Sequence, residues 1–385
     1  MLCRRSTIVI RRNHQMKNRT DICCIFNFYA LYREPIYQLM DKELGCDFYI
    51  GDNKRTKIKA ANYEALKGFK GYLSPTFGLF HRLKGAHKAV MDRQYRKYIA
   101  IGDPYCISIW WLLIWSRLTG KKTVLWTHGW YRDGKWIQNM LNAIFWRLPN
   151  HIMPYGNYAR EHMINKGISP NKMTCIYNSL DYDAELKRRS TVSKDVVHNH
   201  FKNDYPVLFF IGRLIHSKRL DLVIKAMVIL EQEYNMQVNC VLIGDGPAKE
   251  ELTAIVKESQ LVERVWFYGA CYDEDEISQL ISHSDLCVSP GNIGLTAIHS
   301  LTYGSPIITG DDFSHQGPEF EVIQPGITGN FYKQNNVEDL AKSIYEWLVN
   351  VPDRDTLRQT CYKVIDDKWN PHYQIEVIKK VLESV

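Results

Sequence analysis

A stretch in the second half of the chain, residues 289–306, constrains the fold more than any other segment. It reads SPGNIGLTAIHSLTYGSP and follows a short apolar run at 286–288. The apolar run predicts a buried strand, and the spacing of Leu295, Ile298 and Leu301 predicts a helix after a glycine-containing turn. The Gly-Ser-Pro sequence ends that helix. A strand, a glycine turn and a helix in this order are typical of doubly wound α/β domains.

Such a turn can also bind an anion. The first backbone N–H groups of a helix have no partner within the helix, and the helix dipole adds partial positive charge at the same end. A diphosphate is the ligand that fits these features. An ordinary strand-to-helix turn has the same sequence, so this stretch alone supports both interpretations equally.

The composition fits a globular protein of two domains that binds polyanions. Its 385 residues exceed what one hydrophobic core usually organises, and 45% of them are hydrophobic against 24% charged. The net charge of +7 favours nucleotide diphosphates, anionic lipids or nucleic acid as ligands. No nucleic-acid-binding motif accompanies the charge, so we expect no nucleic-acid partner.

The cysteines show no metal-binding pattern. The 10 cysteines form neither a CxxC pair nor a Cys/His cluster at metal-ligand spacing, so the sequence predicts no metal site. Reduced cysteines are typical of the cytoplasm. No long apolar segment follows the N-terminal charges, so we expect no secretory signal and a cytoplasmic protein.

Several segments are consistent with a peripheral contact at the inner face of a membrane, and each also has an alternative interpretation. The run ISIWWLLI at 107–114 is shorter than the roughly 20 residues that span a bilayer. It predicts a helix packed on a sheet, with an interfacial membrane helix as the alternative. Basic residues also gather at 1–19 and 54–70. The first group is either a lead-in before a start at Met16 or a membrane-attracted arm, and the second is either a solvated face or a lipid-headgroup surface.

Alternating strands and helices run through the chain and predict an α/β fold. In the first half we expect strands at 21–26, 98–102, 123–126, 151–154 and 173–177, with helices at 34–44 and 107–118. In the second half we expect strands at 207–211, 238–243, 264–268, 286–288 and 327–332, a further strand that begins at 307–308, and helices at 274–281, 336–350 and 373–384. This alternation is that of doubly wound parallel sheets.

The same pattern gives the domain boundaries. We expect a basic lead-in at 1–19, a first Rossmann-like domain at 20–182, a polar linker at 183–204, a second Rossmann-like domain at 205–366 and a terminal helical segment at 367–385. The apolar face of the last helix needs a surface to cover. In a chain of two domains, the first domain can offer that surface.

Several side chains follow strands and therefore lie at the edge where open α/β sheets bind ligands. Arg213 and Lys218 follow the first strand of the second half, and two fixed cations there can neutralise a departing diphosphate. The glycines at 244–246 follow the next strand, and Gly269 ends the one after it. His128 follows a strand of the first half, where a structural role and a role in the site are both open.

Four segments in this order, GRLIHSKRLD, VLIGDGP, WFYG and GLTAIHSLTYGSP, resemble the retaining GT-B-fold glycosyltransferases of family four. KGISPNKMTCIYNSLD and EVIQPGITG are similar to further segments of that family. The resemblance covers roughly residues 97–385 and is specific in the second half. It implies a GT-B fold, in which two Rossmann-like domains face each other across a cleft and the second holds the nucleotide sugar.

The resemblance also implies roles for individual residues. Arg213 and Lys218 correspond to the diphosphate-binding pair, and His128 corresponds to a histidine near the donor sugar. The implied donor-binding residues are Gly212, Arg213, Lys218, Gly244, Gly246, Gly269, Gly294, Leu295, Thr296 and His299. The last helix would cross back onto the first domain.

One departure from the family concerns its two glutamates. The family carries two Glu residues with seven residues between them, whereas this chain has Gly291 and His299 at those positions. The imidazole of His299 can contact a ribose, because it can donate or accept a hydrogen bond. Gly291 has no side chain to offer. Glu319, two residues before the family-like Glu321, is our candidate for the missing carboxylate.

From the resemblance we expect a retaining glycosyltransferase that needs no metal and no cofactor besides its nucleotide-sugar donor. His128, Arg213, Lys218 and Glu319 are its candidate catalytic residues. The expected acceptor is a glycan or a lipid-linked glycan in surface polysaccharide biosynthesis. The alternative is a catalytically inactive GT-B protein that binds a nucleotide sugar or a partner protein, as Gly291 and His299 suggest.

Overall fold

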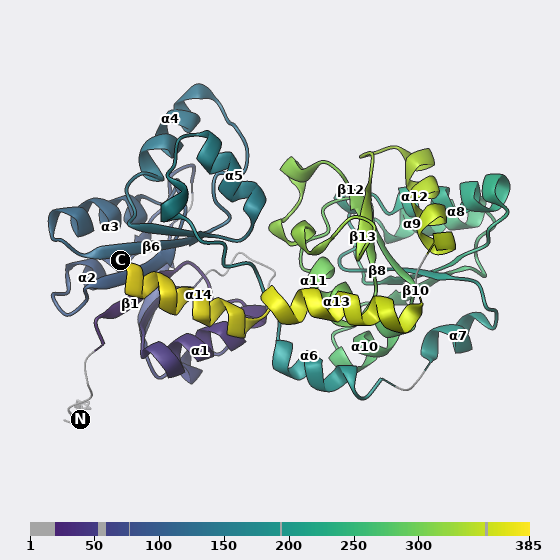
Figure 1. Ribbon diagram of the computed structural model, residues 1–385, viewed down its shortest axis with the longest axis horizontal. Coiled ribbons are helices and arrows are strands. Elements are labelled where there is room, and N and C mark those ends of the chain that lie inside the picture. Colours follow the sequence, from purple (N-terminus) through teal and green to yellow (C-terminus); the bar gives the residue numbers. More distant parts are fainter. Residues whose placement is uncertain (1–19, 53–58, 77, 193–194, 351–352) are drawn as a thin grey trace, which may run out of the picture.

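Two α/β domains lie side by side in the computed structural model (Figure 1). The structure describes residues 20–385 except 53–58, 77, 193–194 and 351–352. The predictions for segment 1–19, including the start at Met16, lie outside the described residues, as does the part of the basic 54–70 segment before residue 59.

The first domain is built on a seven-stranded sheet in the order β4-β3-β2-β1-β5-β6-β7. Its strands are β1 (Ile22–Phe26), β2 (Asp47–Gly51), β3 (Phe69–Pro75), β4 (Leu83–Lys84), β5 (Lys97–Ile101), β6 (Lys122–Thr127) and β7 (His151–Pro154). Its helices are α1 (Glu34–Leu44), α2 (Ala86–Met91), α3 (Ile107–Leu118), α4 (Trp136–Phe145) and α5 (Asn157–Asn165). The strand pairs are parallel except for β3 and β4.

The second domain is built on a six-stranded parallel sheet in the order β10-β9-β8-β11-β12-β13. Its strands are β8 (Val207–Ile211), β9 (Asn239–Ile243), β10 (Val265–Gly269), β11 (Leu286–Ser289), β12 (Ile307–Gly310) and β13 (Gly329–Tyr332). Its main helices are α8 (Asp221–Tyr234), α9 (Lys249–Glu258), α10 (Glu274–Ser282), α11 (Thr296–Thr302), α12 (Val337–Asn350) and α13 (Arg354–Lys368).

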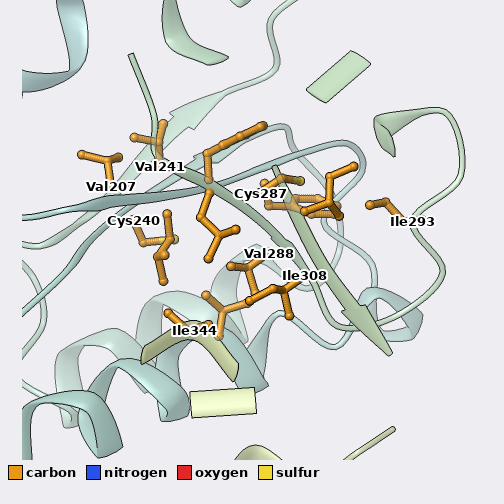
Figure 2. Packing of buried hydrophobic residues seen from close by; sticks show 14 of the residues in the cluster. Val207, Cys240, Val241, Cys287, Val288, Ile293, Ile308 and Ile344 are labelled. Atoms are coloured by element: carbon orange, nitrogen blue, oxygen red, sulfur yellow. The ribbon is translucent and has the colours of Figure 1, made fainter. Parts of the chain in front are cut away.

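Apolar residues on both faces of the second sheet explain why it forms. Val207, Cys240 and Cys287, from three neighbouring strands, are buried in one continuous cluster (Figure 2). Strands that are buried on both faces have nearly continuous apolar sequences. Such apolar runs are the reason that the strands of this sheet were predicted from the sequence. In both sheets the strand order reverses in the middle, beside β1 and beside β8. Doubly wound sheets bind their ligands at the carboxyl ends of such strands.

The chain passes between the domains twice. The predicted strand at 173–177 is not a strand: among the described residues it makes one isolated bridge, between Met173 and Ile152, before the chain enters the second domain. At the other end, α14 (Pro371–Ser384) returns and packs on the first domain. Its residues Ile375 and Ile378 are buried in the same cluster as Tyr37 of α1.

The polar segment predicted as a linker, 183–204, holds two helices instead. These are α6 (Tyr182–Arg189) and α7 (Val196–Phe201). Val197 and Phe201 belong to the core of the second domain, and both helices contact α10. The linker prediction was wrong because these short helices bury few residues, so their exposed charged faces dominate the sequence.

The apolar run at 107–114 forms most of α3, and one side of this helix packs on the sheet as expected. Ile109, Leu112 and Leu113 are fully buried. The opposite side carries exposed apolar residues, among them Trp111 and Leu118. In the described part of the chain, no helix has both the length and the apolar character to cross a membrane.

Candidate functional site

A cavity of about 770 Å³ lies where the two domains face each other. The first domain lines it with Tyr32 and with residues of α1. The second domain lines it with Gly212, with Leu295 and Thr296 at the start of α11, and with His299 one turn further along. Four of the predicted donor-site residues therefore meet at one cavity between the domains.

The start of α11 is fixed to the end of β8. The Thr296 hydroxyl donates a hydrogen bond of 2.8 Å to the carbonyl oxygen of Ile211. Gly294 has a φ of +56°, in the left-handed region that favours glycine, so the turn that aims the helix needs this residue. The sequence prediction of a strand, a glycine turn and a helix at this place is confirmed.

The two predicted cations follow β8 and have no carboxylate partner among the described residues. Arg213 is exposed and follows Gly212 of the cavity wall. The Lys218 ammonium donates a hydrogen bond to the backbone carbonyl of Asn292, in the glycine turn. Burial, and then the charge of Arg213, lower the pKa of Lys218. A dianionic ligand at this turn would relieve the repulsion between the two cations.

The packing around Gly291 explains why no glutamate stands there. A Cβ atom on Gly291 would lie 2.2 Å from the carbonyl oxygen of Ser217, which is far inside van der Waals contact. The Gly291 N–H also donates a hydrogen bond of 3.0 Å to the carbonyl of Lys218. The loop that carries Lys218 therefore occupies the space that a side chain at 291 would need.

Other predicted glycines hold neighbouring backbone segments together. A Cβ atom on Gly244 would lie 1.8 Å from the carbonyl oxygen of Gly212, and one on Gly246 would lie 2.4 Å from that of Leu214. The Gly244 N–H donates a hydrogen bond to the carbonyl of Gly269. None of these three glycines lines the cavity described above, so close backbone packing accounts for them, and a contact with the donor stays a prediction.

His299 stands between two carboxylates at the wall of the cavity. Its Nε2 lies 3.0 Å from an oxygen of Glu274 and 3.8 Å from an oxygen of Glu185. Burial alone would lower the pKa of His299, but the hydrogen bond to Glu274 and both carboxylate charges raise it. Burial raises the pKa of Glu185 to about 7, and the charge of His299 opposes that rise.

These three side chains could bind either a ligand or a cation. Their ligand atoms lie within 4.8 Å of one another, which is close enough to surround a divalent ion. With His299 protonated, they form instead a charged network in which imidazole and carboxylate groups can bond to sugar hydroxyls. Sequence reasoning found His299 but missed Glu185 and Glu274, because Glu185 lies in the supposed linker and Glu274 had no motif.

Glu319 is a buried carboxylate at the boundary between the domains. Its Oε1 accepts a hydrogen bond of 2.8 Å from the Asn178 side chain of the crossing segment. Burial raises the pKa of Glu319, and the bond to Asn178 and the charges of Arg33 and Lys218 oppose the rise. The predicted carboxylate is therefore close enough to feel the charge of a cation from each domain.

Glu321 joins the domains in a way that the sequence did not reveal. Its two oxygens accept hydrogen bonds from the backbone N–H groups of Asn157 (2.7 Å) and Tyr158 (2.8 Å). These groups begin α5 in the first domain, so a carboxylate from the second domain caps a first-domain helix.

His128 lies in the first domain, at the wall of a separate cavity of about 260 Å³. One side of its ring is exposed to solvent, and the ring centre lies 4.8 Å from that of Tyr155. The protein packed around the rest of the imidazole, and then the charge of Arg33, lower the pKa of His128 to about 4. The imidazole is therefore neutral near pH 7 and can either donate or accept a hydrogen bond.

Comparisons with known proteins agree with this architecture. The solved structure of HepE from Anabaena in complex with UDP has a TM-score of 0.70 at 15% identity, covering 95% of this chain and 100% of that one. The apo form of the lipopolysaccharide outer core galactosyltransferase WaaB has a TM-score of 0.68 at 15% identity, covering 94% and 99%. The protein has the GT-B fold, with two Rossmann-like parallel sheets.

The sequence comparisons specify the second domain further. Residues 193–364, most of the second domain, match the family described as Glycosyl transferases group 1. An uncharacterized glycosyltransferase of Methanocaldococcus jannaschii is 20% identical over 250 residues. That alignment covers 64% of this chain and 61% of the relative, so the chain spans about six tenths of the relative's length.

Proposed function

We propose that this protein is a glycosyltransferase that moves a sugar from a nucleotide-diphosphate sugar to a glycan or lipid-linked glycan. The observation that carries the proposal is the pair of cations after β8. Arg213 and Lys218 form no ion pair among the described residues. They follow Gly212, which lines the cavity between the domains, and Lys218 bonds to the glycine turn before α11. Because the HepE relative was solved with UDP, a UDP-sugar is the first donor to test.

The arrangement supports transfer with retention and without a metal. The bond between the anomeric carbon and the diphosphate oxygen breaks, and Arg213 and Lys218 stabilise the negative charge that develops on that oxygen. The acceptor hydroxyl attacks the anomeric carbon from the same face, and its proton passes to the departing phosphate oxygen. The neutral His128 and the Glu319 carboxylate then orient the sugar rather than supply a proton.

The exposed apolar face of α3 and α4 supports the proposal that the protein docks on the inner face of a membrane and there glycosylates a lipid-linked acceptor. Its exposed apolar residues are Ile107, Trp111, Ile114 and Leu118 on α3, and Trp136, Ile137, Met140 and Ile144 on α4. The two helices are adjacent, since the rings of Trp110 and Phe145 lie 5.2 Å apart. Figure 1 shows both on the outer side of the first domain.

The charges around this face match an anionic bilayer. Between residues 104 and 150 the chain has six Lys and Arg and a single acid, Asp133. One of these cations, Lys121, is buried, and the others leave the segment with a positive charge. Apolar and aromatic side chains in a cationic segment are typical of surfaces that enter the headgroup region. A role in surface polysaccharide synthesis agrees with the name of the WaaB relative, a lipopolysaccharide galactosyltransferase.

The test is incubation of the protein with a panel of UDP-, GDP- and ADP-sugars. We expect one donor to bind and to be slowly hydrolysed to free sugar and nucleotide, because water can replace the acceptor in the cleft. Neither binding nor hydrolysis with any donor would overturn the proposal.

The second candidate is a GT-B protein that binds a nucleotide sugar without using it. The tight packing at Gly291 favours it, since no side chain can reach the donor from there. Tight nucleotide binding with no release of sugar, even when crude membrane glycolipids are added as acceptors, would support this candidate against the first.

A further inference from the structure

The small cavity of the first domain has the features of a binding site in its own right. It lies at the carboxyl ends of β1, β5 and β6, and its polar walls are Asn27, Arg33, Asp103, Thr127 and His128. No described residue lines both this cavity and the larger one between the domains. Its volume of about 260 Å³ suits one small chemical group rather than a nucleotide.

Arg33 places a positive charge at this cavity, and no described carboxylate forms a direct ion pair with it. Its guanidinium carbon lies 5.3 Å from the ring centre of Tyr155, 5.4 Å from that of Tyr32 and 5.9 Å from that of Trp126. Its Nε is buried without a hydrogen-bond partner. Within the described part of the chain, Arg33 forms no ion pair.

The nearby carboxylates are held by other groups. Asp103 also lines the cavity, but it lies 3.2 Å from the imidazole of His81 and accepts the backbone N–H of Tyr105 at 2.9 Å. Glu319 is bonded to Asn178 across the domain boundary. Neither carboxylate is recorded in an ion pair with the Arg33 guanidinium, although the charges of Arg33 and Glu319 act on each other.

Arg33 is half-buried and its Nε is shut off from water, and a buried guanidinium N–H needs an anion or another acceptor. Aromatic faces attract the charge, but they do not accept these hydrogen bonds in the plane of the group. Tyr32, Trp126 and Tyr155 surround the guanidinium and restrict its movement, and a planar guanidinium can make a two-point contact with a carboxylate or phosphate.

We propose that this cavity binds an anionic group of the acceptor, a carboxylate or a phosphate, through Arg33. The assignment rests on the proposed glycosyltransferase function. The donor diphosphate has its own cations in the second domain, Arg213 and Lys218, which leaves Arg33 for the second substrate. The reaction that supplies the acceptor must then have introduced an acidic sugar or a phosphate group.

The test is titration calorimetry of the full chain saturated with UDP, with inorganic phosphate and malonate as probes at constant ionic strength. We expect one of the two anions to bind, and Arg33→Met to weaken that binding at least tenfold. The matched control is Arg93→Met, which removes an exposed arginine of the same domain that does not line the cavity. It should leave binding of both anions unchanged.

A second variant keeps the test decisive if Arg33→Met does not fold. Arg33→Lys retains the charge but loses the planar fork, so we expect two- to fivefold weaker anion binding in a folded protein. Anion binding that is the same in wild type and in a folded Arg33 variant would overturn the inference, as would no anion binding by the wild type.

UDP titrations separate the two possible sources of the anion. A UDP affinity that falls tenfold in Arg33→Met would assign Arg33 to the donor phosphate and overturn the acceptor site. Arg33-dependent phosphate binding in a protein that binds no nucleotide would support the anion site but overturn the proposed function. Donor hydrolysis without Arg33-dependent anion binding would overturn this inference alone.

Discussion

The two domains present their candidate sites in different ways. In the second domain, the cations and the glycine turn follow strands directly in the sequence, so the site is built by local chain geometry. In the first domain, Arg33, His128 and Tyr155 come from separate segments and meet only through packing. The proposed donor side is therefore visible in the sequence, whereas most of the proposed acceptor side becomes visible only in three dimensions.

The largest effect should follow the loss of the local donor site. Lys218→Ala removes a cation that we propose stabilises the departing diphosphate, and removing one such group typically lowers kcat by about 100-fold or more. Donor hydrolysis, measured as nucleotide release, checks this. Lys257→Ala removes an exposed lysine of α9 in the same domain and should leave the rate unchanged. Equal rates in the two variants would remove the basis for the donor site.

The outer face of the first domain should give the next largest effect. Trp111→Glu combined with Leu118→Glu puts two charges on the exposed apolar side of α3, so we expect at least tenfold weaker binding to vesicles. Cosedimentation with phosphatidylglycerol–phosphatidylcholine vesicles measures it. The control pair, Val262→Glu with Val349→Glu, changes exposed apolar residues of the second domain. Equal losses in both pairs would mean that the α3 face is not the docking surface.

How well the sequence predicted the structure also differs between the two domains. Strands β8 to β12 were predicted closely because buried parallel strands are apolar without interruption. Strand β3 was missed because it alternates buried and exposed residues, includes Gly71 and lies toward one edge of its sheet. The Glu321 cap joins residues 164 positions apart, and no local pattern records such a contact.

The cap across the domains tests whether the two halves depend on each other. Glu321→Gln replaces a carboxylate that accepts two backbone N–H groups at the start of α5, and losing such a cap costs about 1 kcal/mol. Urea unfolding should show this loss. Glu161→Gln neutralises an exposed carboxylate on α5 itself and should change the free energy of unfolding much less. If the two variants are equally stable, Glu321 does not fasten the domains.

The last prediction concerns a cluster in the proposed donor side whose residues are far apart in the sequence. Glu185, Glu274 and His299 come from α6, α10 and α11, and they meet at the cavity through packing, as the first-domain residues do. Even the domain with the clearer sequence motifs thus depends on contacts that its motifs do not record. The pH dependence of stability reports on this cluster, because its groups hold protons differently in the folded and unfolded chain.

Burial raises the pKa of Glu185 to about 7, while an unfolded glutamate titrates near pH 4.3. The folded state therefore binds the proton more tightly, and stability falls as pH rises through that interval. The raised pKa of His299 acts in the same direction, because its contribution is lost as pH rises through the folded value. In Glu185→Gln, the part of this pH dependence of stability that comes from the Glu185 carboxyl group disappears. The Tm of the variant relative to wild type should therefore increase by about 2 °C between pH 5 and pH 8 in a calorimetric scan. A difference that stays constant with pH would show that Glu185 is ionised throughout and that the cluster is open to solvent.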